Sequence, residues 1–120
     1  MKILNSKRVS SDDRGVIDVV CEDGPWERMN HIRTKKGFIR GDHYHQLNSE
    51  LHYVLNGSLE LYVRDLRTGE EATYQFIGGD CFIVEPHEFH TLRHLEDSEY
   101  MVLFSRRFDS ENPDVHKDET

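Results

Sequence analysis

Short segments of alternating apolar and polar residues recur through most of the chain. In the clearest of them, residues 58–64, Leu59, Leu61 and Val63 alternate with polar or amphipathic residues. A period of two is typical of a strand with one buried face. Comparable segments, rich in β-branched and aromatic residues, predict further strands at 16–20, 72–77, 81–84, 88–95 and 99–105.

Pairs of residues that contain at least one glycine separate these segments. Asn56-Gly57 predicts a tight hairpin, because both central residues of a type I′ turn take positive φ. Thr68-Gly69 and Gly78-Gly79 carry the same signal less specifically. No helical periodicity is evident between residues 37 and 108. Regularly spaced short strands joined by turns predict an all-β sandwich or barrel.

The chain has 120 residues and 14.2 kDa, which predicts one domain. We expect residues 1–108 to form the barrel with an N-terminal strand extension, and residues 109–120 to form a charged, flexible tail. No apolar run approaches the roughly 20 residues that span a bilayer, and the first residues do not resemble a secretory signal. We therefore expect a cytoplasmic protein without a membrane partner.

The net charge is −8 and the pI is near 5.4, which argues against nucleic acid as a partner. An acidic chain can still bind a phosphorylated ligand where a few arginines converge. Cys21 and Cys81 are far apart in sequence and match no CxxC pattern. In a cytosolic chain they are expected to be reduced thiols.

The chain has eight histidines, and the spacing of some of them predicts a metal site. His43 and His45 are two residues apart, so on a strand they share a face. Glu50 opens the next predicted strand, and His90 begins a later one. Three imidazoles and one carboxylate suit one divalent transition metal ion, whether zinc, iron, manganese, nickel or cobalt.

The other histidines carry weaker signals. His31, His87 and His116 are interpreted as ordinary surface or core residues. His52 and His94 are each two or four residues from a predicted ligand, so they are candidates for orienting a ligand from outside the metal's coordination sphere.

Two longer motifs add a resemblance to a known family. Residues 37–57 resemble the first motif of the cupin superfamily (RmlC-like) at its defining positions, and residues 79–90 resemble the second. The second departs from the usual pattern at Glu85, where proline is common, and at His87, where glycine is common. The resemblance implies a small single-domain double-stranded β-helix, or jelly-roll barrel. It also implies metal binding by His43, His45, Glu50 and His90.

A narrower resemblance points to sugar nucleotides. Residues 36–44 are similar to the Lys-Gly-x-x-Arg-Gly-x-His-Tyr signature of sugar-nucleotide 3,5-epimerases of rhamnose biosynthesis. Asp13-Arg14-Gly15 resembles a segment that this family shares with sugar 3,4-ketoisomerases. The resemblance implies that Arg14 and Arg40 contact the substrate and its diphosphate, a role that the planar guanidinium suits.

These resemblances imply an epimerase or isomerase of a nucleotide-diphosphate 4-keto-deoxy sugar. Such a reaction removes an α-proton and stabilises an enolate. His43 would be the base only if the site is metal-free, because a metal ligand cannot also be the free base. Otherwise Tyr62 and His52 are the catalytic candidates.

This chain keeps all four ligands, whereas the rhamnose epimerases replace the second histidine with glutamine and work without metal. It is therefore most similar to the metal-binding cupin domains of capsular-polysaccharide sugar enzymes. Two alternatives stay open: a non-haem metal-dependent dioxygenase of a small organic substrate, and a non-catalytic sugar-binding or sensor cupin. We also expect a homodimer, because pairing removes an exposed sheet edge.

Overall fold

The computed structural model describes residues 1–118, and these residues form strands, turns and loops only. In that part of the chain there is no helix of the length and apolarity that crossing a membrane would need. The described strands are β1 (Lys2–Leu4), β2 (Lys7–Asp12), β3 (Gly15–Val19), β4 (Arg28–Thr34), β5 (Ile39–His43), β6 (Glu50–Asn56), β7 (Ser58–Asp65), β8 (Glu71–Ile77), β9 (Cys81–Val84), β10 (Glu88–His94) and β11 (Ser98–Phe104).

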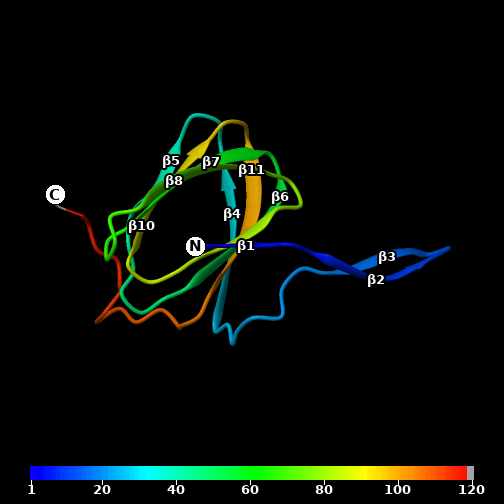
Figure 1. Cartoon of the computed structure of the whole chain (residues 1–120), viewed down its shortest axis with the longest axis horizontal. Helices are drawn as coiled ribbons and strands as arrows, with labels where there is room; N and C mark the ends of the chain where they lie inside the picture. The colour runs from blue at the N-terminus through cyan, green and yellow to red at the C-terminus, as the bar shows by residue number, and fades with distance from the viewer. Residues whose placement is uncertain (119–120) are drawn as a thin grey trace.

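Two antiparallel sheets enclose the interior and make the all-β cupin-type barrel that the motifs implied (Figure 1). One sheet has the order β1-β9-β6-β11-β4, and the other has the order β5-β10-β7-β8. Strands that are neighbours in sequence therefore often lie in opposite sheets. This arrangement brings residues from distant parts of the chain to the space between the sheets.

The alternation predicted for residues 58–64 is confirmed by the burial of β7. Leu59 and Leu61 are 1% and 0% exposed and face the core between the sheets. From other strands, Phe76 and Phe82 stack with ring centroids 4.3 Å apart. Each large apolar side chain buried in this way stabilises the fold by roughly 1.5–3 kcal/mol relative to an exposed one.

Two of the three predicted hairpins are wrong. β6 pairs with β9 and β11, whereas β7 pairs with β8 and β10, so the chain crosses between sheets at Gly57. Gly57 does have positive φ, at 98°, but here it lets the chain cross from one sheet to the other at a corner of the barrel. Gly78-Gly79 likewise connects β8 to β9 of the opposite sheet. The hairpin at Thr68-Gly69 is confirmed, because β7 and β8 are paired.

The strand extension expected at the N-terminus is a hairpin of β2 and β3, which projects away from the barrel (Figure 1). Apolar side chains on it remain exposed, among them Val9, Val16 and Ile17. The hairpin makes the longest dimension of the molecule 54 Å against 31 and 28 Å for the other two.

The expected flexible tail needs correction for residues 109–118. Tyr44 and His116 form an antiparallel bridge, and Asp114 is only 5% exposed. The segment is held by hydrogen bonds instead of by apolar burial, so its polar composition gave no sign of this packing. Residues 119–120 lie outside the described part of the chain.

Candidate metal centre

The four predicted ligands lie together at one end of the barrel interior. The candidate ligand atoms of His43, His45, Glu50 and His90 are all within 4.8 Å of one another. The pairing of β5 with β10 sets His43 directly opposite His90, and Glu50 is the first residue of β6 in the other sheet. His45 follows the bridge residue Tyr44, so His43 and His45 do project to the same side. The two sheets therefore each contribute ligands to one cluster.

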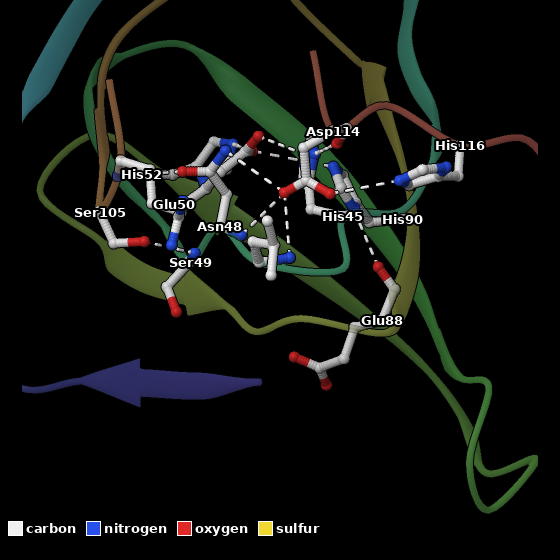
Figure 2. A network of polar contacts seen from close by, with 12 residues as sticks. His45, Asn48, Ser49, Glu50, His52, Glu88, His90, Ser105, Asp114 and His116 are labelled. Atoms are coloured by element: carbon white, nitrogen blue, oxygen red, sulfur yellow. Dashed lines mark hydrogen bonds and ion pairs between the residues drawn. The ribbon is translucent and has the colours of Figure 1, made fainter. Parts of the chain in front are cut away.

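Main-chain carbonyls orient two of the imidazoles (Figure 2). Nδ1 of His45 lies 2.6 Å from the carbonyl oxygen of Asp114, and Nδ1 of His90 lies 3.0 Å from that of Glu88. A carbonyl only accepts hydrogen bonds, so each ring donates from Nδ1. Nε2 of each ring then faces the cluster, which is the arrangement that metal-ligating histidines need.

The electrostatics of the cluster favour one negative charge. Burial would raise the pKa of Glu50, but His45, His52 and His90 lower it to about 2. Burial lowers the pKa of His90, so this ring is favoured in its neutral form. For His45 burial acts in the same direction, but Glu50 outweighs it and the pKa is raised.

These residues fit a divalent transition metal ion. Nε2 of His45 lies 2.5 Å from Oε1 of Glu50, yet it has no hydrogen-bond partner of acceptable geometry. His45 is 4% exposed and His90 is 1% exposed, so water does not readily satisfy the converging nitrogens. Three imidazole nitrogens and a carboxylate are a donor set typical of zinc, iron, manganese, nickel and cobalt. A bound cation would give these acceptors a common partner.

The cluster borders a cavity of about 370 Å³. Apolar side chains that include Ile32, Leu92 and Val102 line part of it. Four arginines also line the cavity: Arg28, Arg40, Arg106 and Arg107. Size and lining suit an organic ligand that carries negative charge.

His52 is the buried histidine nearest to the cluster that is not part of it. It lines the cavity, and its Nε2 lies 3.6 Å from Oε2 of Glu50. Its ring stacks on Phe82 with centroids 4.7 Å apart. Burial lowers the pKa of His52 to about 4, so the ring is neutral at physiological pH. Its Nδ1 is buried without a hydrogen-bond partner.

Arg40, which was predicted to bind substrate, lines the cavity, and a series of hydrogen-bonded side chains supports it. Its Nε donates to Oγ1 of Thr34 at 2.6 Å, and Thr34 in turn bonds to the Tyr100 hydroxyl. Nε2 of His94 lies 3.0 Å from that hydroxyl, while Nδ1 of His94 donates to the carbonyl of Phe38. We call these four side chains, Arg40, Thr34, Tyr100 and His94, the Arg40 network.

Two predicted site residues lie elsewhere. Tyr62 is on β7 between the buried residues Leu61 and Val63, so strand alternation directs it to the outer face, where it contacts Phe89. Its expected place in the site is therefore wrong. Arg14 is at the turn of the projecting hairpin, 89% exposed and paired with Asp12, and it does not line the cavity of its own chain.

Several residues beside the centre carry no signal in the sequence. Arg106 and Arg107 follow the last strand and carry no motif. Arg28, at the start of β4, lies over the rings of Phe104 and Phe108 at 4.7 and 5.3 Å. Asp114 is in a segment with several acidic residues, and nothing in the sequence distinguishes it from them. All of these contacts are distant in sequence, so local patterns could not predict them.

Solved structures share this fold. WlaRB, a TDP-quinovose 3,4-ketoisomerase from Campylobacter jejuni, aligns with a TM-score of 0.80 and 19% identity over 98% of this chain and 92% of its own. A 3,4-ketoisomerase from Helicobacter canadensis aligns with 0.78 and 21% identity over 98% and 90%. CapF, a capsular polysaccharide assembling protein from Staphylococcus aureus, aligns with 0.73 and 20% identity over 97% of this chain.

This chain spans only 33% of the CapF chain, so the similarity there concerns one part of a longer protein. No curated protein matches the chain in sequence. The sequence profile of the polysaccharide biosynthesis C-terminal domain matches residues 10–116, which is nearly the whole chain. The chain therefore belongs to the polysaccharide biosynthesis C-terminal domain family.

Proposed function

We propose that this protein is a metal-binding cupin that epimerises or isomerises a nucleotide-diphosphate 4-keto-deoxy sugar. The observation that carries the proposal is the ligand cluster at the border of a cavity that four arginines also line. The family and the fold shared with 3,4-ketoisomerases support it.

In this proposal the arginines bind the charged end of the substrate. A diphosphate accepts several charge-assisted hydrogen bonds, and a guanidinium offers them in a planar fork. Arg40 uses Nε for Thr34, which leaves its terminal nitrogens for the ligand. The apolar part of the cavity excludes water from the sugar ring.

A divalent ion bound by the cluster would supply Lewis acidity toward the keto group. The α-proton then needs a base that is not a ligand. His52 fits, because it lines the cavity and burial lowers its pKa to about 4, which leaves the ring neutral at physiological pH. We assign the base to His52. Without a metal ion, His43 is the alternative base.

We further propose a homodimer in the cytoplasm. The β2–β3 hairpin, with its exposed apolar side chains, is the surface that we expect a second copy to cover. Arg14, on that hairpin, would then serve a substrate only in the assembled dimer. Both cysteines are free, which fits a reducing compartment. Light scattering of the purified protein checks the dimer, and a monomeric mass would contradict it.

The test of function is proton exchange followed by NMR. Protein purified without chelators is analysed for bound metal and then mixed with a TDP-4-keto-6-deoxy sugar in deuterated water. We expect loss of the signals of protons next to the ketone, because α-deprotonation exchanges them with solvent. Metal removal is expected to slow this exchange.

His90→Gln is the variant to compare with wild type, and His31→Gln is its control. His31 is on the surface and pairs with Glu99, so the same chemical change there leaves the cavity intact. We expect exchange to be lost in His90→Gln only. Oxygen consumption with a phenol or thiol, without any exchange, would favour the dioxygenase, and binding of the sugar nucleotide without exchange would favour the sugar-binding module.

A further inference from the structure

Asp114 is a buried acidic residue in an otherwise exposed, polar segment. It is 5% exposed, and it lines the same cavity as the four ligands. Its carboxylate and its carbonyl both contact residues 45–48, and the carboxylate also lies 3.2 Å from Nε2 of His116, as Figure 2 shows. The contacts are of two kinds.

The first kind involves the carboxylate. Main-chain N–H groups of Gln46, Leu47 and Asn48 donate to it at 2.8, 3.0 and 2.9 Å. These residues form the turn between His45 and Glu50. Three consecutive N–H groups bound to one carboxylate have their orientations set together, so the carboxylate holds the shape of this turn.

The second kind involves the main-chain carbonyl. It accepts the hydrogen bond from Nδ1 of His45 at 2.6 Å. Asp114 has φ of 57°, in the left-handed region, and in this conformation its carbonyl and its carboxylate both reach residues 45–48. The carbonyl fixes the rotation of the His45 ring and leaves Nε2 to face the cluster.

The segment is also fixed next to the turn. Tyr44 and His116 exchange two main-chain hydrogen bonds, at 2.9 and 3.0 Å. Tyr44 is the residue between His43 and His45. The chain around Asp114 is thus bound to the ligand-bearing loop before, at and after His45.

We propose that Asp114 is a positioning residue of the metal centre, with its carboxylate holding the turn from His45 to Glu50 and its carbonyl holding the His45 ring. The inference rests on the metal site of the proposed function. It concerns an arrangement that exists without the metal, so metal-free protein can test it.

Two variants and a control test the contribution of the carboxylate. Asp114→Gly removes the carboxylate, keeps the carbonyl and tolerates the positive φ. Asp114→Asn keeps the shape and one acceptor oxygen. Glu111→Gln removes a charge from an exposed residue of the same segment, and its side chain makes none of these contacts.

Two measurements are made on each full-length variant. Zinc affinity is measured by competition with a chromophoric chelator, and the tautomer of His45 is read from ¹⁵N NMR of metal-free protein at alkaline pH. We expect Asp114→Gly to weaken zinc binding roughly 10- to 100-fold and to lose the single Nδ1–H tautomer. Asp114→Asn should lie between Asp114→Gly and wild type, and Glu111→Gln should match wild type.

Unchanged zinc affinity and an unchanged His45 tautomer in folded Asp114→Gly would overturn the proposal. Equal weakening in Glu111→Gln would overturn it too, because net charge would then be the cause. If the glycine variant does not fold, the same comparison is made with Asp114→Asn. A protein that shows these effects but exchanges no sugar proton contradicts only the proposed reaction.

Discussion

His52 and the metal ligands differ in one property that decides what each can do. The candidate ligand atoms of the four residues converge on one another, whereas His52 lines the cavity outside this group, with its Nε2 3.6 Å from Oε2 of Glu50. Burial keeps His52 neutral, and a neutral imidazole is able to accept a proton. The site therefore has a candidate base that is separate from its candidate ligands.

Replacing His52 by glutamine should separate chemistry from metal binding. We expect His52→Gln to retain its metal and to lose sugar-proton exchange by at least about 100-fold, the usual scale of general-base catalysis. Metal analysis and NMR exchange on the same sample measure both quantities. Exchange at the wild-type rate would assign the base to another residue.

A second prediction at the residue scale concerns the Arg40 network. Tyr100→Phe deletes the hydroxyl that bonds to both Thr34 and His94. Leaving those buried groups unpaired should lower the free energy of unfolding by about 1–3 kcal/mol. It should also weaken sugar-nucleotide binding, because Arg40 loses its support. Urea denaturation and calorimetry measure the two effects.

Tyr62→Phe is the matched control. Tyr62 is on the outer face of β7, and no hydrogen bond of its hydroxyl is described. We expect unfolding within about 0.5 kcal/mol of wild type and unchanged exchange. A large loss of exchange in Tyr62→Phe would restore the catalytic role that the sequence suggested and the register argues against.

At the scale of elements, the connections between strands decide which residues meet. β6 and β7 follow each other in sequence but belong to opposite sheets, so Gly57 forms a corner of the barrel. A Cβ built at Gly57 would overlap Oγ of Ser98, and one at Gly69 would have no heavy atom within 4 Å. Both glycines have positive φ.

These two glycines should therefore respond differently to the same change. Gly69→Ala should cost about 1–2 kcal/mol, from positive φ alone. Gly57→Ala adds the steric conflict, which costs typically about 1–3 kcal/mol more. Chemical denaturation of both variants measures the difference. Equal losses would mean that the corner can move to accommodate the methyl group.

The same elements explain how far the sequence could predict the fold and the site. Periodicity located several of the strands, because alternation depends on neighbours in sequence, but it did not indicate β1, β2 or β4. Spacing located the four clustered residues, since two short segments carry them. The sequence could not distinguish a hairpin at Gly57 from a crossover between sheets, because both need positive φ there. It also could not place Asp114, whose contacts with His45 and the turn after it are more than 60 residues away in sequence.

At the scale of the whole molecule, metal binding should stabilise the fold. The ligands come from both sheets, so an ion bound by all of them connects the two halves of the barrel. An ion present at 1,000 times its dissociation constant adds about 4 kcal/mol. In a domain of this size, chelation should then lower Tm by on the order of 10 °C.

Calorimetry with and without chelator measures this shift. His90→Ala should unfold at the same temperature in both conditions, because it lacks one ligand. His31→Ala, outside the cluster, should keep the full shift. A chelator effect of the same size in His90→Ala would place the stabilising ion at another site.

The position of Asp114 in the chain has a consequence for biosynthesis. All four candidate ligands are translated by residue 90, but the group that orients His45 is translated 24 residues after the last of them. A nascent chain, or a product truncated before Asp114, would carry the whole ligand set in an unsupported form. Full metal affinity is thus expected only after this segment has been translated and has packed against the turn from His45 to Glu50.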